Sequence, residues 1–168
     1  MPPTNLTADD VRQLYDRYSR ALLAYACSFV PDVAAAEDIL HQVFLQLLKG
    51  NTAAPDEPKA YLYRAVRNAA LNARRNGHRE VAHSESGATE SGALFEHRGG
   101  DQDAALALQA ALRELPAEQR EVVTLKIWSG MTLEEIGALS RIPTNTAASR
   151  YRYGLEKLRE RLKPHYRG

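Results

Sequence analysis

The residues best equipped for chemistry lie between Met131 and Tyr153, and they carry hydrogen-bonding groups rather than a catalytic set. Thr132 and Glu135 fit a capping box, Ser/Thr-x-x-Glu, which satisfies the unpaired amide groups at a helix start. Pro143 then prevents one continuous helix, because it lacks an amide donor and disfavours a helical residue before it. The segment therefore predicts two short helices joined by a tight turn, a helix-turn-helix.

The second of these helices is predicted to begin after a cap at Thr144 and to have two different faces. The inward face repeats at helical spacing and consists of Ala147, Tyr151, Leu155, Leu158 and Leu162. The outer face and its flanks carry small, amide, hydroxyl and guanidinium groups, which reach base edges or phosphates in the major groove of DNA. The candidate DNA-binding residues are Thr144, Asn145, Thr146, Ala148, Ser149, Arg150, Arg152 and Tyr153. An ordinary helical hairpin is the alternative interpretation.

Charge is distributed unevenly along the chain, although the formal net charge is only +1. Residues 1–80 carry a net charge of +1, residues 81–103 a net charge of −4 and residues 104–168 a net charge of +4. The basic residues after Arg150 suit phosphate contacts, although a solvated face is the commoner explanation of a charge run. An acidic connector between a near-neutral part and a basic part indicates two modules with different partners.

Hydrophobic periodicity predicts an all-α protein of two small helical domains joined by a flexible linker. Residues 1–77 show three helical patterns: one after Thr7, one running from Asp32 to Gly50, and one that starts at Pro58 and ends at Asn76-Gly77. Residues 78–102 are rich in Ser, Gly, Glu and His, which is typical of a flexible linker. Residues 103–168 form the second predicted helical domain and include the helix-turn-helix.

The sequence shows no pattern of an enzyme. It contains no His-Glu-x-x-His, no phosphate-binding glycine loop and no Cys/His cluster with metal-ligand spacing. Acidic pairs such as Glu37-Asp38 are adjacent, so their carboxylates diverge by about 100° around a helix. We therefore expect a protein that acts by binding, without a metal or a cofactor.

Cellular location is predicted from what the chain lacks. There is no apolar run of about 18 residues and no secretion leader, which argues against a membrane span and against export. The single cysteine, Cys27, is best explained as a small buried hydrophobe. We expect a cytoplasmic protein.

The segment from Lys59 to Arg75 interleaves aromatic and basic residues. This combination suits unpaired or melted DNA, because rings stack on bases and cations neutralise phosphates. The alternative is a helix with its aromatics in the core and its arginines in water. The side chains suited to such binding are Tyr61, Tyr63, Arg64, Arg67, Asn68, Asn72, Arg74 and Arg75.

The predicted helix Glu37–Leu48 has a second face beside its apolar one. Asp38, His41, Gln42 and Leu45 share that face at positions i, i+3, i+4 and i+7. A face that mixes an acid, an imidazole, an amide and a leucine fits a partner helix, although an amphipathic core helix has a similar pattern.

Four runs, in this order, give the chain a specific resemblance. They are AEDILHQVF at 36–44, YLYRAVRNAALNARR at 61–75, LPAEQREVV at 115–123 and EEIGALSRIPTNTAASR at 134–150. Together with the helices between them they cover most of the chain, and it resembles the extracytoplasmic-function (ECF) sigma factors, the small two-domain members of the bacterial sigma family.

The resemblance implies partners and site residues. It implies core RNA polymerase, through its clamp helices and flap, and promoter DNA as partners, with an anti-sigma protein as a further one. The residues implied to contact polymerase are Glu37, Asp38, His41, Gln42 and Leu45. Those implied to hold the −10 element are Lys59, Tyr61, Arg64, Arg67, Asn68, Asn72 and Arg75. The helix beginning at Thr144 is implied to read the −35 element. The linker is implied to run towards the active site and RNA-exit path of polymerase. From its charge we infer that its acidic residues there mimic nucleic acid; these are Glu85, Glu90, Glu96, Asp101 and Asp103.

This chain departs from the family pattern at several implied contacts. His41-Gln42 stands where Gln-Glu is frequent, Tyr61 replaces a Trp and Asn72 replaces an Asp. Asn145, Ala147 and Ala148 stand where Gly, Val and Lys are common, which removes one cation and adds a potential adenine reader. The promoter sequence of relatives therefore does not transfer to this chain. Gly154, where Ala is common, is expected to cost the helix up to about 1 kcal/mol.

Two other functions remain compatible with the residues. One is a helix-turn-helix regulator that binds duplex DNA without polymerase, which would have no use for the Tyr61–Arg75 pattern. The other is a sigma-like decoy that binds polymerase or an anti-sigma protein but reads no promoter. Binding to duplex DNA alone favours the first, and polymerase binding without promoter-dependent transcription favours the second.

Overall fold

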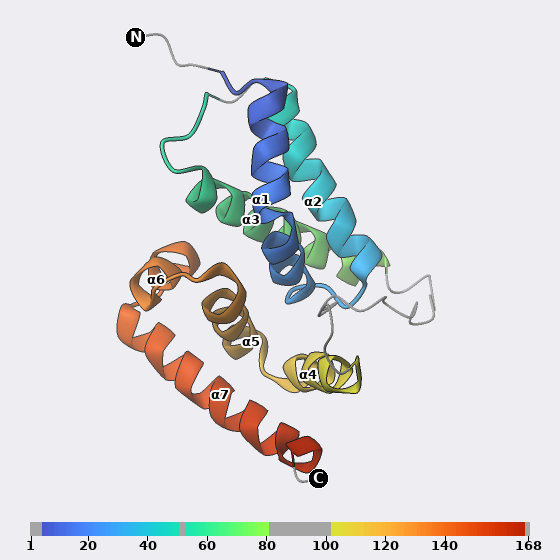
Figure 1. Ribbon diagram of the computed structural model, residues 1–168, viewed down its shortest axis with the longest axis vertical. Coiled ribbons are helices and arrows are strands. Elements are labelled where there is room, and N and C mark those ends of the chain that lie inside the picture. The colour runs from blue at the N-terminus through green and yellow to red at the C-terminus, as the bar shows by residue number, and fades with distance from the viewer. Residues whose placement is uncertain (1–4, 51–52, 81–101, 167–168) are drawn as a thin grey trace. The chain divides into compact units, whose positions relative to one another are not determined.

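The computed structural model describes residues 5–50, 53–80 and 102–166, and the chain divides into two compact units, Met1–Glu90 and Ser91–Gly168. Within the described residues every regular element is helical, apart from an isolated antiparallel bridge between Asn5 and Ala53. The predicted all-α fold class is confirmed (Figure 1). Most of the predicted linker, including Glu85, Glu90, Glu96 and Asp101, lies outside the described residues.

The first unit consists of three helices that each pack against the other two (Figure 1). They are α1 (Ala8–Cys27), α2 (Val33–Leu48) and α3 (Pro58–Glu80). Their core is rich in aromatic side chains: the ring centroids of Tyr25 and Tyr63 lie 5.5 Å apart, and Tyr15 meets Phe44 edge-on at 5.1 Å. Such pairs add to the free energy of burial and hold the three helices in one arrangement.

The starts of α1 and α2 are fixed by side-chain caps, as the sequence predicts. The amide of Asp10 donates a hydrogen bond to the Thr7 hydroxyl at 3.1 Å, and the Thr7 amide donates to the Asp10 carboxylate at 2.9 Å. These two bonds complete the capping box of α1. The backbone and hydroxyl hydrogen bonds from Thr7 lower the pKa of Asp10, so this cap weakens as the pH falls through that lowered pKa. Asp32 caps α2 by accepting a hydrogen bond from the amide of Ala34 at 3.0 Å.

The predicted end of the third helix is wrong. The sequence predicts a stop at Asn76-Gly77, whereas α3 continues to Glu80. Gly77 does not adopt the left-handed conformation with which glycine ends helices, in contrast to Gly50 after α2, whose φ is +70°. The described part of α3 therefore extends into the stretch that the sequence assigns to the linker.

Tyr63 contradicts its predicted role, because it is 1% exposed and faces the core rather than DNA. Its hydroxyl has no hydrogen-bond partner, and burial raises its pKa above the ordinary value for tyrosine. A buried hydroxyl without a partner costs free energy that a methine group of the same ring avoids.

We expect Tyr63→Phe to raise the free energy of unfolding of the first unit by about 1 kcal/mol, because the substitution removes the unpartnered hydroxyl and keeps the ring. Thermal unfolding followed by circular dichroism measures the change. Tyr15→Phe is the matched control, since Tyr15 is 38% exposed. A loss of stability in Tyr63→Phe, with Tyr15→Phe neutral, would contradict this account.

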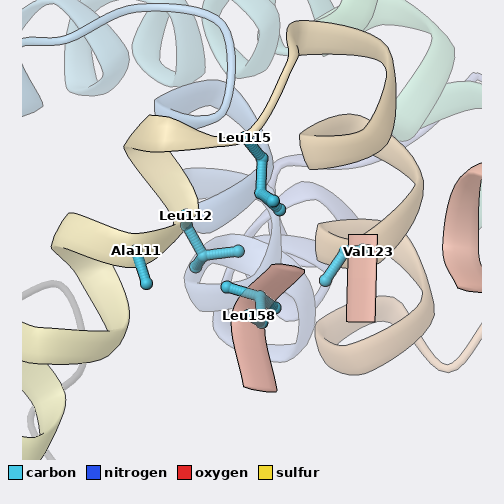
Figure 2. Close-up of a cluster of buried hydrophobic side chains, with 5 residues drawn as sticks. All are labelled: Ala111, Leu112, Leu115, Val123 and Leu158. Atoms are coloured by element: carbon cyan, nitrogen blue, oxygen red, sulfur yellow. The ribbon is translucent and has the colours of Figure 1, made fainter. Parts of the chain in front are cut away.

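The second unit is organised around its last helix. It comprises α4 (Gln102–Glu114), α5 (Ala117–Thr124), the π-helical turn η1 (Leu125–Ser129), α6 (Leu133–Ser140) and α7 (Thr144–Tyr166), and α7 packs against α4, α5 and α6. Figure 2 shows a cluster of apolar side chains around Leu158 of α7. The others come from α4, from Leu115 directly after α4, and from α5. The cluster contains Ala111, Leu112, Leu115, Val123 and Leu158, with Leu108, Trp128, Tyr151, Leu155 and Leu162 packed against it. The predicted inward face of this helix is confirmed, because Ala147 is also fully buried.

Arg120 joins α5 to the end of α4. Its guanidinium donates hydrogen bonds to the carbonyl oxygens of Leu112 at 2.9 Å, Arg113 at 2.8 Å and Leu115 at 2.8 Å. The last carbonyls of a helix have no partner within the helix, and a cation there also interacts favourably with the helix dipole. Arg120 therefore caps α4 from the neighbouring helix.

The turn between α6 and α7 depends on Gly137. The amide of Ile142 donates to the carbonyl of Gly137 at 2.9 Å, and Arg141 takes the left-handed conformation with a φ of 58°. A Cβ added at Gly137 would lie 2.8 Å from the carbonyl oxygen of Ile142. The glycine therefore allows the backbone after the turn to approach α6 closely.

Two predictions in this region need correction. Thr144 is the first residue of α7 rather than its cap, because the carbonyl of Pro143 already accepts the first helical hydrogen bond, from Ala147 at 3.0 Å. Gly154 does more than weaken its helix: a Cβ at this position would lie 2.6 Å from Cγ2 of Val123. The glycine thus permits the close crossing of α5 and α7.

Candidate nucleic-acid and polymerase interfaces

The outer face of α7 and its two flanks hold all eight residues predicted to bind −35 DNA. None of them is buried, whereas Ala147 between them is fully buried. Thr144, Asn145, Arg152 and Tyr153 are exposed, and the other four are half-buried. Small side chains near the start of this helix leave room for a close approach to a groove floor.

Two local interactions order this face. The Ser149 hydroxyl donates a hydrogen bond to the carbonyl oxygen of Asn145 at 3.0 Å. The Cζ atom of Arg152 lies 5.2 Å from the ring centroid of Tyr153, which is a cation–π contact. The face therefore presents a hydroxyl bonded to the backbone and a guanidinium held beside an aromatic ring.

The basic residues further along α7 have mixed surroundings. Arg161 forms an ion pair with Glu114 of α4, and both side chains are more than half exposed. Exposed ion pairs of this kind contribute little stability. The main effect of the pair is that Glu114 neutralises one of the basic side chains of α7. Lys157, Arg159 and Lys163 are exposed.

The five residues predicted to contact polymerase all lie on the exposed face of α2. Glu37, Asp38, His41, Gln42 and Leu45 are exposed, while Ile39, Leu40, Val43, Phe44 and Leu47 fill the opposite, buried face. Leu45 is 54% exposed, and Leu48, one turn further on, is 52% exposed. Two large apolar side chains uncovered among polar ones are typical of a protein-binding surface.

An open groove of about 560 Å³ lies between α2 and α3. Tyr61 and Asn72 line it from α3, and Gln42 and Leu45 line it from α2. Ala65 and Ala69 line it between the tyrosine and the asparagine, and their small side chains leave it open along α3. The helix packing thus joins residues from the predicted polymerase surface and the predicted −10 surface in one groove.

The other residues predicted for −10 DNA divide between two sides of α3. Arg64, Asn68 and Arg75 are exposed and share a face with Tyr61 at helical spacing. Arg67 lies about 120° around the helix from Tyr61 and is half-buried. Lys59 is also half-buried. The structure therefore gathers most of this set on one side but places Arg67 and Lys59 apart from it, Lys59 lying about 160° around the helix from Tyr61.

Two polar residues that line the groove were not predicted from the sequence. Gln46 and Lys49 follow Gln42 by one and two turns of α2. Their spacing from Gln42 was visible, but only the packing of α2 against α3 shows that they face Tyr61. Among the described residues that line the groove, Lys49 is the only charged one, and its ammonium group favours an anion such as a phosphate.

The described part of the chain contains neither a metal-binding cluster nor a membrane-spanning helix. No group of three or more His, Cys, Asp or Glu side chains in it is arranged to hold a metal ion. None of its described helices is long and apolar enough to cross a membrane.

Comparison with known proteins identifies both units. A family model of sigma-70 region 2 matches residues 14–80, and one of sigma-70 region 4 matches residues 105–158. The chain is 30% identical over 159 residues to the ECF RNA polymerase sigma factor SigL of Mycobacterium tuberculosis, covering 89% of this chain and 86% of SigL. It is 29% identical over 158 residues to the RNA polymerase sigma factor CarQ of Myxococcus xanthus, covering 92% of this chain and 90% of CarQ.

Solved structures show the same architecture. The sigma factor RpoE, from its co-crystal structure with the anti-sigma factor NepR of Bartonella quintana, has a TM-score of 0.76 and 28% identity, and the match covers 93% of this chain and 98% of RpoE. CnrH, in complex with the cytosolic domain of CnrY, has a TM-score of 0.55 at 21% identity, which supports the fold.

The three-helix bundle and the helix-turn-helix unit are thus the two halves of a transcription initiation factor of the sigma-70 type. The chain belongs to the ECF family of RNA polymerase sigma factors. The predicted function is confirmed at that level: the protein binds core RNA polymerase and recognises promoter DNA. A duplex-DNA regulator that works without polymerase does not account for the match to region 2.

Proposed function

We propose that the first unit docks on core polymerase through the exposed face of α2 and holds the melted −10 strand along α3. The second unit places the start of α7 in the −35 duplex. In this proposal the two DNA-binding modules are residues 1–77 and 103–168, with residues 78–102 connecting them. The observation that carries the proposal is that the exposed faces of α2, α3 and α7 hold nearly all the implied contact residues.

The polymerase surface centres on apolar side chains. Leu45 and Leu48 are more than half exposed, and Asp38, His41 and Gln42 lie beside them on α2. An apolar centre with a polar rim supports docking by burial, with orientation set by the polar groups. A carboxylate at Asp38 favours a basic partner surface and disfavours an acidic one.

The −10 surface follows the exposed side of α3. The ring of Tyr61 offers a stacking platform, and Arg64 and Arg75 on the same face offer cations for the phosphates. Asn68 and Asn72 offer amide groups that hydrogen-bond with base edges. The groove between α2 and α3 adds Gln46 and Lys49 to this surface.

The protein contributes no reaction step of its own in this proposal. It acts by binding: polymerase performs the chemistry in the cytoplasm, and the sigma factor selects and opens the promoter. An anti-sigma protein is a further proposed partner, supported by the RpoE–NepR structure, in which a similar sigma factor is bound by one.

The proposal is tested with the full chain and core polymerase. Asp38→Arg is expected to weaken polymerase binding by about 10-fold or more, because it reverses a charge in the docking face. Asp16→Arg makes the same change on the exposed side of α1 and is expected to leave binding unchanged. Fluorescence anisotropy with labelled core polymerase gives both affinities.

A second arm separates the two modules. Arg150→Ala is expected to lower −35-dependent transcription and to leave polymerase binding intact, because Arg150 lies on the flank of α7. Equal loss of polymerase binding in Asp38→Arg and Asp16→Arg would refute the α2 assignment. Polymerase binding by a wild-type protein that supports no promoter-dependent transcription would instead identify a decoy.

A further inference from the structure

The contact between Arg152 and Tyr153 places a guanidinium in the middle of the DNA-facing side of α7. Adjacent residues of a helix point about 100° apart and do not ordinarily meet. The 5.2 Å separation between Cζ of Arg152 and the Tyr153 ring therefore requires both side chains to lean towards the line between them. Ser149 lies on that line, one turn earlier, and both aromatic and cation are exposed.

The contact with Tyr153 leaves N–H groups of the Arg152 guanidinium free to donate hydrogen bonds to DNA. The guanidinium carbon lies over the ring, and the N–H donors that point away from the ring remain available to DNA. Two donors in a fixed fork match the O6 and N7 acceptors of guanine in the major groove. A flexible arginine would lose conformational entropy on binding, and the stack has already removed part of that cost.

A phosphate is the competing ligand for Arg152, and position decides against it. The backbone of the duplex runs along the two sides of a helix inserted in the groove, and bases lie opposite its outermost line. Arg150 lies about 160° around α7 from Arg152 and is half-buried, which suits a phosphate contact on one flank. Arg152 lies only about 60° around the helix from Ser149, and its contact with Tyr153, on the other side of Ser149, keeps its guanidinium near that outermost line.

The neighbouring serine adds a second chemical constraint. The Ser149 hydroxyl donates its proton to the carbonyl of Asn145, so it offers DNA an oxygen lone pair. That lone pair accepts from the amino group of adenine or cytosine. Asn145 itself suits adenine through its amide. Seven residues separate Asn145 from Arg152, which is about 10 Å along the helix axis, or about three base-pair steps.

We infer that Arg152 is the specificity-determining residue for a guanine in the −35 element, with Tyr153 as the residue that positions it. The inference rests on the proposed −35 role of α7 and extends it to a base. The guanine lies within about three base pairs of the site read by Asn145, and Ser149 faces a base that carries an amino group between them.

The experiment uses the full chain bound to core polymerase and a duplex library randomised across the −35 region. Wild type is expected to enrich guanine at one position by about 10-fold or more over the other bases. Arg152→Ala is expected to lose that preference alone, and Arg152→Gln to shift the same position towards adenine. Arg159→Ala is the matched control, since it removes an exposed arginine further along the same helix.

Tyr153 is tested by two variants in the same library. Tyr153→Phe keeps the stacked ring and is expected to keep the guanine preference. Tyr153→Ala is expected to weaken the preference at that position without moving it to another base. Equal profiles for Tyr153→Ala and wild type would remove the positioning role. Circular dichroism checks that each variant remains folded, as expected for exposed residues.

Two results overturn the assignment of Arg152. One is a guanine preference that survives in Arg152→Ala, and the other is a uniform loss of affinity across all sequences, which is the signature of a phosphate contact. A third result would contradict the proposed function itself. If the wild-type protein binds polymerase but selects no −35 sequence, then α7 does not read the −35 element, and the inference about Arg152 fails with it.

Discussion

Replacing Arg120 by Met is expected to lower the free energy of unfolding of the second unit by about 3 kcal/mol. The substitution removes three hydrogen bonds from a charged donor to the carbonyls of Leu112, Arg113 and Leu115. Hydrogen bonds to charged groups contribute about 1.5–3 kcal/mol each, reduced here because Arg120 is only half-buried and water replaces part of the loss. Methionine keeps much of the aliphatic stem, so the change isolates the guanidinium.

The measurement is urea unfolding followed by tryptophan fluorescence. The single tryptophan, Trp128, packs against the cluster of α4, α5 and α7, so its emission reports on the second unit alone. Arg159→Met is the control, because Arg159 is exposed on α7. Equal midpoints for Arg120→Met and wild type would show that water caps α4 as well as the arginine does.

Replacing Gly137 by Ala is expected to destabilise the second unit by about 2 kcal/mol and to reduce −35-dependent transcription. The new methyl group would lie 2.8 Å from the Ile142 carbonyl oxygen, a backbone atom that no side-chain rotation can move. Overpacking of this kind costs about 1–3 kcal/mol, which exceeds the gain in helix propensity of up to about 1 kcal/mol. Relief requires α7 to shift relative to α6, and that shift displaces the DNA-binding face.

Gly77→Ala is a control in the same chain for which the expected change in stability has the opposite sign. Gly77 is helical in α3, and a Cβ there meets no atom within 4 Å, so alanine is expected to stabilise the first unit by up to about 1 kcal/mol. Trp128 fluorescence and calorimetry distinguish the two units. Polymerase binding should be unchanged in Gly137→Ala; a more stable Gly137→Ala protein would show that the turn has room to adapt.

The sequence predicts features of this protein that depend on local chemistry. Helix starts at Thr7, Asp32 and Pro58 follow from capping groups and from the fixed φ of proline. Helical periodicity also identifies the buried and exposed faces of α2 and α7, because each face is set by residues three and four apart. The fold class and the outer faces of the candidate sites are therefore readable before any tertiary structure is known.

Features that depend on how two helices pack against each other cannot be predicted from local sequence patterns. Tyr63 looks like a base-stacking residue until the packing of α1 against α3 buries it. Gly154 looks like a weak helix position until Val123 is seen 2.6 Å from its missing Cβ. Gln46 and Lys49 join a candidate site only because α2 and α3 together form a groove. In each case the deciding atom belongs to a residue distant in sequence.

The groove between α2 and α3 has a thermodynamic consequence for promoter opening. Gln42 and Leu45 belong both to the proposed polymerase surface and to the wall that faces Tyr61 and Asn72. A partner that orders these two side chains also removes part of the entropy cost of binding a strand beside them. The two binding events are then linked by one coupling free energy, and reciprocity requires each to strengthen the other by the same factor. If α2 and α3 act as proposed, assembly with polymerase raises the affinity of the sigma factor for melted DNA above that of the free protein.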